Sequence, residues 1–216
     1  MEKIFAVYKP KGPTSHDIIN IIRKKTGERK VGHAGTLDPL AEGVLVIGVG
    51  KQSVKNLSEI VKKEKEYIAK IKLGQNSTTD DEEGQKSEIK IKERPTEDEI
   101  KQILKFFFGE IKQVPPAFSA VKVKGQKAYI MARKGKPLFL PAKTVEIKDI
   151  ELLKYDWPFL EIRFITGPGV YIRSLARDIG KLLGTGGYLA ELMRTRVGQY
   201  FYADAEKIEI AKSNFN

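Results

Sequence analysis

Two hydrophobic periods alternate along the chain and predict its strands and helices. Between residues 65 and 73 one face carries an apolar side chain at every second position, which is the period of a half-buried strand. Between residues 53 and 63 apolar side chains return every three or four positions, which is the period of an amphipathic helix. The same patterns predict further strands at 4–8, 44–49, 118–123, 144–154, 159–166 and 197–202, and further helices at 14–27, 95–109, 129–133, 171–183 and 203–210.

Cap residues mark several of these ends. Thr14 and Asp17 stand three residues apart, as the hydroxyl and the acid of a capping box do, and Gly27 ends the same helix. Residues 29–43 and the acidic residues 75–85 follow neither period. We expect the first segment to be a structured loop and the second to be an exposed loop.

The order of the elements predicts an α+β fold. Strands follow one another mostly as hairpins, and helices are interspersed irregularly. A mixed or antiparallel central sheet with flanking helices therefore fits better than a regular βαβ series. Since neither a repeat nor a linker divides the sequence, residues 1–216 are expected to form a single domain.

Composition excludes several classes of protein. The 216 residues include no cysteine and two histidines, which excludes disulfides and thiolate nucleophiles and argues against a metal site. The longest apolar run, residues 44–49, is far below the roughly 18 residues that cross a bilayer, and the N-terminus does not have the form of a signal peptide. We expect a cytoplasmic protein that does not associate with membranes.

Positive charge dominates outside one acidic segment. The formal net charge is +11, yet residues 80–99 hold nine acids against four bases, which leaves +16 for the rest of the chain. Residues 119–148 are the densest basic segment, with eight bases and one acid. Such asymmetry indicates a surface that binds a polyanion such as a nucleic acid. A solvated surface adapted to high temperature is the alternative interpretation.

Residues 32–43 are the segment richest in candidate chemistry. Glycines permit tight backbone conformations there, and Pro39 biases Asp38 toward an extended conformation, which would fix the direction of its carboxylate. Residue types alone leave a common Asp-Pro turn as the alternative.

This segment resembles the catalytic loop of the TruB-type tRNA pseudouridine-55 synthases, whose pattern is GHxGxLDPxAxG. Four further segments match that family in the same order: residues 8–12, 65–67 with 73–74, 116–122 and 169–174. The resemblance covers about residues 4–202. It implies a pseudouridine synthase fold and an enzyme that flips out a T-loop uridine, at position 55 of tRNA, and isomerises it to pseudouridine without a cofactor.

The resemblance also implies roles for three catalytic residues. Asp38 would be the catalytic carboxylate, by attack on the base, by attack on the sugar or by promoting a glycal intermediate. Arg173 would pair with Asp38 and keep it ionised, and Tyr67 would stack on the target uracil. A surface or phosphate-binding arginine and a core tyrosine are the alternative interpretations.

Four further residues are implied to contact the substrate. Tyr171 and Leu192 match residues that line the uracil pocket, and His33 matches a histidine that stacks within the remodelled T-loop. Lys9 would support the floor of the site or contact a phosphate. A hydrogen-bonded structural histidine is the alternative for His33.

Partners follow from the same resemblance. We expect tRNA to be the partner of a monomeric enzyme, with residues 119–148 as an RNA-contacting insertion and with the family's usual C-terminal PUA domain absent. The catalytic subunit of a guide-RNA ribonucleoprotein and a non-catalytic RNA-binding protein are the alternatives. The first would need guide RNA and the second would not need Asp38.

Overall fold

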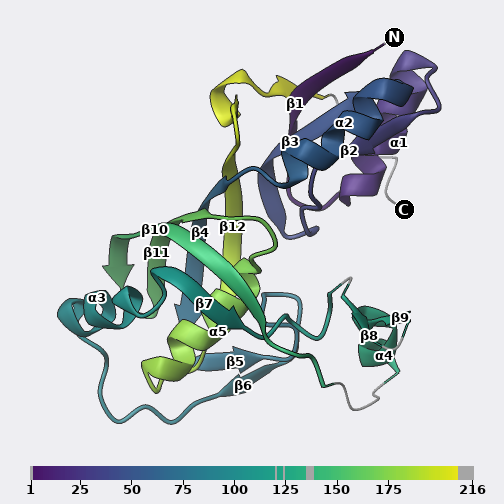
Figure 1. The fold of residues 1–216 in the computed structure, drawn as a ribbon. Helices are drawn as coiled ribbons and strands as arrows, with labels where there is room; N and C mark the ends of the chain where they lie inside the picture. Colours follow the sequence, from purple (N-terminus) through teal and green to yellow (C-terminus); the bar gives the residue numbers. More distant parts are fainter. Residues whose placement is uncertain (1, 120, 124, 135–138, 209–216) are drawn as a thin grey trace. The chain divides into compact units, whose positions relative to one another are not determined.

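The computed structural model describes residues 2–119, 121–123, 125–134 and 139–208, which group into two compact units. Unit 1 comprises residues 1–68 and 192–216, and unit 2 comprises residues 69–191. Strands β4 (Lys65–Leu73) and β12 (Gly187–Val197) have residues in both units (Figure 1).

Unit 1 is a mixed sheet with two helices. Its strand order is β14-β1-β3-β12-β4, with β2 paired to β3 and β13 paired to β12. β1 runs antiparallel to β3, whereas β14 runs parallel to β1 and β12 runs parallel to β3. The further elements are β1 (Lys3–Lys9), α1 (Ser15–Thr26), β2 (Val31–His33), β3 (Ala41–Val49), α2 (Lys51–Val61), β13 (Tyr200–Phe201), the 3-10 turn η1 (Tyr202–Asp204) and β14 (Glu206–Lys207).

Helix α1 begins where its sequence predicts. The Thr14 hydroxyl accepts a hydrogen bond from the Asp17 amide, and the Asp17 carboxylate accepts one from the Thr14 amide, so the capping box is complete. Gly27 ends the helix in the left-handed conformation. The buried face of α1 presents Ile18 and Ile22 to the core of this unit, which β1 and β3 complete.

A close approach between β3 and β12 requires glycine at position 43. A Cβ on Gly43 would lie 2.2 Å from the Arg194 carbonyl oxygen, and its φ is +109°. Gly12 has nearly the same φ, +105°, but a Cβ there would meet nothing within 4 Å. The two glycines thus separate the cost of the clash from the cost of the backbone conformation.

We expect Gly43→Ala to lower the free energy of unfolding by more than about 4 kcal/mol, because the clash with a strand backbone adds to strain of about 1–3 kcal/mol. Gly12→Ala should cost only the strain. Urea unfolding followed by circular dichroism measures both variants. Equal losses would show that β12 moves away from β3 at no cost.

Unit 2 combines β4 with an antiparallel hairpin and a buried helix. Its strand order is β4-β11-β10-β7, and β10 is antiparallel to both β11 and β7. The further elements are β5 (Gln75–Ser77), β6 (Lys86–Glu88), α3 (Glu97–Lys105), β7 (Gly109–Gln113), β8 (Lys122–Val123), β9 (Gln126–Lys127), α4 (Ala128–Arg133), β10 (Lys143–Asp156), β11 (Phe159–Thr166) and α5 (Ile172–Leu182).

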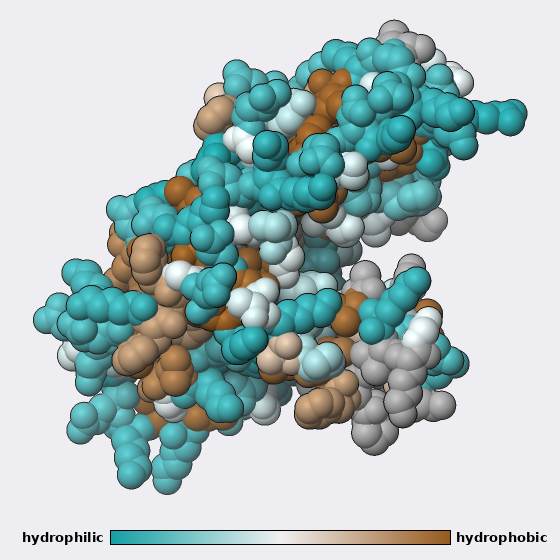
Figure 2. Space-filling model, viewed as in Figure 1, coloured by the Kyte–Doolittle hydropathy of each residue, from teal (hydrophilic) through white to brown (hydrophobic). Residues whose placement is uncertain are grey.

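The surface is largely hydrophilic, as the charge predicts. Figure 2 shows hydrophilic side chains over most of the visible face and apolar side chains gathered over α3 and the strands beside it. The latter area includes an open hollow lined by Leu104, Phe108, Ile150 and Leu152 among others. In the predicted insertion, 119–148, the described residues form the short β8-β9 hairpin, α4 and the first part of β10, while residues 120, 124 and 135–138 lie outside the described chain.

Five predictions need correction. In the predicted strand 118–123 only β8 (Lys122–Val123) is a strand, and residue 120 lies outside the described chain. The last long strand is β12, not 197–202, which contains only the end of β12 and the short β13. Residues 29–43 contain β2 and the start of β3, and residues 75–85 begin with β5 and bury Asp81. The described part of 203–210 is not a helix but the end of η1 followed by β14, which pairs with β1. The predicted α+β class with a mixed sheet is confirmed.

Candidate active site

Backbone hydrogen bonds clamp the loop that carries Asp38. The loop, residues 34–40, connects β2 to β3, and Asp38 itself is half-buried. The Ser15 hydroxyl donates to the Leu37 carbonyl oxygen at 2.9 Å and accepts from the Leu37 amide at 2.8 Å. The Gly12 amide donates to the Pro39 carbonyl oxygen at 2.9 Å, and the Ala41 amide donates to the Asp38 carbonyl oxygen at 3.0 Å. None of these four bonds uses the Asp38 carboxylate, and together they fix the backbone from which that carboxylate projects.

Arg194 holds the same loop from within the core of unit 1. Its guanidinium donates from Nη2 to the Gly35 carbonyl oxygen at 3.0 Å and from Nε to the Val44 carbonyl oxygen at 2.8 Å. The residue is 1% exposed. The two bonds tie the start of the loop to β3, so Arg194 fixes the loop at the end opposite to Ala41. Sequence reasoning missed this role, because a strand arginine carries no local signal of its partners.

Two buried lysines complete a cationic group with Arg194. Lys9 Nζ donates to the Ala41 and Pro10 carbonyl oxygens at 2.7 and 2.9 Å, and Lys65 Nζ donates to the Val61 and Lys63 carbonyl oxygens at 2.8 and 2.7 Å. Burial lowers the pKa of each lysine to about 8, and the Arg194 charge contributes in the same direction.

Lys9 also lies within electrostatic reach of the catalytic candidate. The negative charge of Asp38 opposes the fall in the pKa of Lys9. The hydrogen bonds of Lys9 support the end of the loop, and its role as the floor of the site stays a prediction.

The stability of the protein is expected to rise between pH 8 and pH 10 through these lysines. The pKa of Lys65 is about 8 in the folded protein against 10.5 in the unfolded chain. Over this interval the unfolded chain therefore binds more protons, so stability increases with pH. Urea unfolding at pH 7.5 and 9.5 measures the gain, which should be smaller in Lys65→Met. An equal gain in both proteins would contradict this assignment.

His33 ends β2 at the entrance to the loop. Its Nδ1 is buried and has no hydrogen-bond partner among the described residues. Burial lowers the pKa of His33, and the positive charges of Arg194 and His16 act in the same direction. His33 is therefore a neutral imidazole at physiological pH, a state suited to stacking.

Leu192 lies on β12, the strand beside β3 in the sheet of unit 1, and Tyr67 lies on β4, the next strand in the order. Tyr67 is on the same buried face of β4 as Lys65, so its ring is part of the interior. Leu192 stands opposite Ala41 in the β3-β12 register, directly beside the end of the Asp38 loop. The structure thus brings Leu192 next to the loop.

Tyr171 and Arg173 lie at the start of α5 in unit 2. Gln113 clamps the Tyr171 backbone, since its side-chain amide donates to the Tyr171 oxygen at 3.1 Å and its oxygen accepts from the Tyr171 amide at 2.9 Å. Ser174 Oγ donates to the Val114 oxygen at 2.9 Å. The end of β7 therefore fixes the first turn of α5.

Arg173 forms a buried ion pair with Asp81. Its Nη1 lies 3.1 Å from Asp81 Oδ2, and further bonds run to the carbonyl oxygens of Thr79 and Phe118 at 3.3 and 3.0 Å. Asp81 is 2% exposed and also bonds the Thr79 hydroxyl. These contacts fix the guanidinium in one orientation. The predicted exposed loop at 75–85 therefore holds an anion that positions Arg173.

The seven predicted site residues divide between the units. Lys9, His33, Asp38, Tyr67 and Leu192 belong to unit 1, and Tyr171 and Arg173 belong to unit 2. The pairing of Arg173 with Asp38 stays a prediction. In unit 1 the structure adds Ser15, Lys65 and Arg194 to the residues around the loop, and in unit 2 it adds Asp81 and Gln113.

Solved structures share this fold. The chain matches one in a complex of Cbf5, Nop10 and Gar1 with a TM-score of 0.71 and 32% identity, over 92% of this chain and 49% of that one. A second, an H/ACA ribonucleoprotein bound to a substrate RNA containing 2'-deoxyuridine, matches with a TM-score of 0.67 and 29% identity. This chain spans about half the length of each of these solved chains (49% and 48%).

Sequence comparisons identify relatives over most of the chain. The tRNA pseudouridine synthase B of Parabacteroides distasonis is 45% identical over 88% of this chain and 83% of its own length, and that of Thermobifida fusca is 43% identical over 98% and 75%. The model for the N-terminal domain of TruB family pseudouridylate synthases matches residues 23–172, and the model for the C-terminal domain of tRNA pseudouridylate synthase B matches residues 173–212. The Asp38 loop, residues 34–40, lies inside the first of these two matches, and the chain belongs to the TruB family of pseudouridylate synthases.

Proposed function

We propose that this chain converts the T-loop uridine at position 55 of tRNA into pseudouridine, with Asp38 as the catalytic carboxylate and without guide RNA. The observation that carries the proposal is the clamped Asp38 loop, whose backbone is held by the Ser15 hydroxyl at Leu37 and by the Arg194 guanidinium at Gly35. An enzyme gains most from such preorganisation where a reacting group must be aimed before the substrate arrives.

The reaction is an isomerisation that conserves every atom of the nucleotide. The bond between ribose C1' and uracil N1 breaks, the uracil turns, and a bond forms between C1' and C5. The proton at C5 is lost and N1 gains a proton, so no net oxidation occurs. An ionised Asp38 would act on the base, on the sugar or in forming a glycal, and each route needs a negative charge beside the scissile bond.

The remaining site residues would bind and orient the flipped uracil. Extrusion removes the stacking of the base, which an aromatic ring such as that of Tyr67 replaces. Tyr171 and Leu192 would line the pocket, and His33 would stack in the T-loop where the base has left. Arg173, held by Asp81, would supply the fixed positive charge that keeps Asp38 ionised.

The positive charge outside residues 80–99 would hold the tRNA. Lysine and arginine contacts to phosphates release counterions, so binding should weaken as salt increases. Residues 119–148 are the proposed RNA-contacting insertion. The protein is proposed to act as a monomer in the cytoplasm. A T-loop is a suitable target because its bases are partly unstacked before binding.

An unmodified tRNA transcript tests the function directly. The protein is incubated with the transcript without added metal or guide RNA, and pseudouridine is mapped along the RNA. We expect a single modified position, in the T-loop, and none in a transcript with cytidine at that position. Modification that requires an added guide RNA would favour the ribonucleoprotein alternative. Tight tRNA binding without modification would favour a non-catalytic RNA-binding protein.

A further inference from the structure

Two adjacent aspartates of unit 2 pair with two arginines one helical turn apart. Asp80 and Asp81 lie in the turn between β5 and β6, and Arg173 and Arg177 lie on α5. Arg177 Nη1 is 2.8 Å from Asp80 Oδ2, and Arg173 Nη1 is 3.1 Å from Asp81 Oδ2. The second pair holds the proposed active-site arginine. The first pair is not used by the proposed mechanism.

The backbone at Asp80 is unusual. Its φ is +62°, and in the described chain it is the one residue other than glycine with a positive φ. Aspartate tolerates this left-handed conformation better than most residues, yet it still costs free energy and persists only where the surroundings hold it. The Asp80 carbonyl accepts a hydrogen bond from the Leu189 amide at 3.1 Å, and the Asp80 carboxylate is held by Arg177.

Arg177 is itself fixed by its neighbours. It donates from Nε to Asp178 Oδ1 at 2.9 Å and from Nη2 to the Val114 carbonyl oxygen at 2.9 Å, which also accepts from Ser174. The guanidinium therefore ties the turn at Asp80 to α5 and to the residue that follows β7. Because Asp80 and Asp81 share a peptide bond, the angle at which Asp81 meets Arg173 depends on this tie.

We propose that the Arg177–Asp80 ion pair positions Arg173 for catalysis, by fixing the turn that presents Asp81. This proposal rests on the proposed function. Arg177 and Asp80 are positioning residues, because neither is proposed to touch the substrate. Their side chains are 28% and 14% exposed, so removal of either partner leaves a largely buried charge without this ion pair. A purely structural role therefore predicts a loss of stability with kcat unchanged below the unfolding transition.

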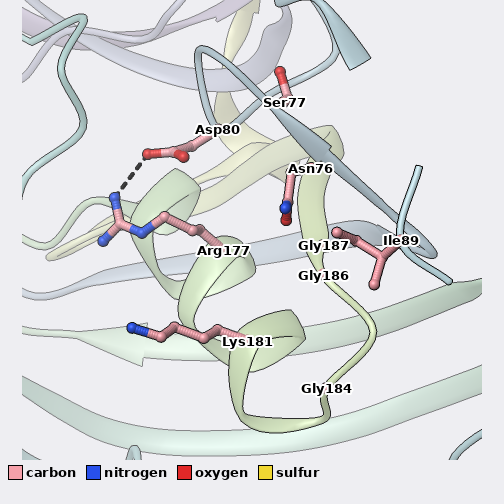
Figure 3. A pocket seen from close by; sticks show the side chains of 9 residues that line it. All are labelled: Asn76, Ser77, Asp80, Ile89, Arg177, Lys181, Gly184, Gly186 and Gly187. Atoms are coloured by element: carbon pink, nitrogen blue, oxygen red, sulfur yellow. Dashed lines mark hydrogen bonds and ion pairs between the residues drawn. The ribbon is translucent and has the colours of Figure 1, made fainter. Parts of the chain in front are cut away.

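The same pair lines an open hollow, and a third residue of that hollow, Lys181, offers a control substitution. Figure 3 shows Asp80 and Arg177 joined by their ion pair and Lys181 one turn further along α5. All three line a hollow of about 470 Å³, together with Asn76 and Gly186. In the part of the chain that the structure describes, the Lys181 amine makes no ion pair. Lys181→Met therefore removes one cation from the same helix and hollow without touching the turn.

The test compares Arg177→Met, Asp80→Asn, their double variant and Lys181→Met. Turnover is measured on the tRNA transcript, KM on the same substrate, and thermal unfolding on each protein. We expect kcat to fall about tenfold in each single variant while KM stays within twofold, and the double variant to be no slower than the slower single variant. Arg177→Lys should recover part of kcat, and Lys181→Met should keep it.

Several outcomes would overturn the proposal. These are an unchanged kcat in Asp80→Asn, additive losses in the double variant, or an equal loss in Lys181→Met. Asp80→Asn keeps the size of the side chain, so it remains informative if Arg177→Met fails to fold. Wild-type protein that leaves the transcript unmodified would contradict the proposed function instead, and therefore the two failures are distinguishable.

Discussion

Asp38→Asn is expected to slow pseudouridine formation at least about a thousandfold, equivalent to about 4 kcal/mol of transition-state stabilisation, while tRNA affinity stays within twofold. Asparagine has the shape of aspartate but no charge, and the loop is clamped through backbone atoms and neighbouring residues. The variant therefore keeps the site and loses only the anion. Release of tritium from C5 of the uridines under single-turnover conditions measures the rate, and filter binding measures affinity.

Glu28→Gln is the matched control for this charge removal. Glu28 is a half-buried carboxylate of unit 1, and it accepts a hydrogen bond from the Lys30 amide outside the loop. Its loss changes net charge equally and should leave the rate within twofold. Turnover by Asp38→Asn at the wild-type rate would contradict the assignment of Asp38, whatever its chemical role.

Arg194→Met is expected to lower both the stability of the protein and the rate of catalysis. The substitution removes the donor from the buried Val44 carbonyl oxygen and from the partly buried Gly35 carbonyl oxygen, at a cost of about 2–4 kcal/mol. It also releases the start of the Asp38 loop, and a misplacement of about 1 Å costs about a hundredfold in rate. Urea unfolding gives the first quantity, and single-turnover kinetics below the unfolding transition give the second.

Arg196→Met separates the two roles. Arg196 lies two residues further on β12 and pairs with Glu64 at 2.7 Å, away from the loop. We expect this variant to lose less stability than Arg194→Met, because its ion pair is partly exposed at Glu64, and to keep its rate within twofold. A rate loss in Arg196→Met equal to that in Arg194→Met would mean that catalysis responds to the stability of β12, and the loop-clamping role would fail.

Elements with local signals were predictable from the sequence. Helix α1 has its N-cap at Thr14 and its C-cap at Gly27, so the signals for both of its ends directly adjoin the helix in the sequence. Strand β4 has the predicted bounds because its alternation is unbroken. The Asp38 loop was identifiable because its glycines permit tight backbone conformations and Pro39 restricts the residue before it.

Features that depend on distant partners were not predictable in this way. β12 contains Leu189, Glu191 and Met193, which do not favour a strand by themselves, and its conformation comes from pairing with β3, far away in the sequence. Asp81 lies in an acidic segment that resembles a solvated loop. It is buried because it forms an ion pair with Arg173, a residue far away in the sequence. The burial of Arg194 likewise depends on carbonyl groups about 150 residues earlier.

The pairing of β14 with β1 has a consequence for the behaviour of the protein at high concentration. β14 covers the outer edge of β1 near Val7 and Tyr8, and among residues 2–68 and 192–208 no strand pairs with the first half of that edge. Uncovered strand edges recruit further chains and lead to aggregation. The Lys3–Glu206 ion pair places charge beside this edge, and charged side chains there disfavour association of one molecule with the next.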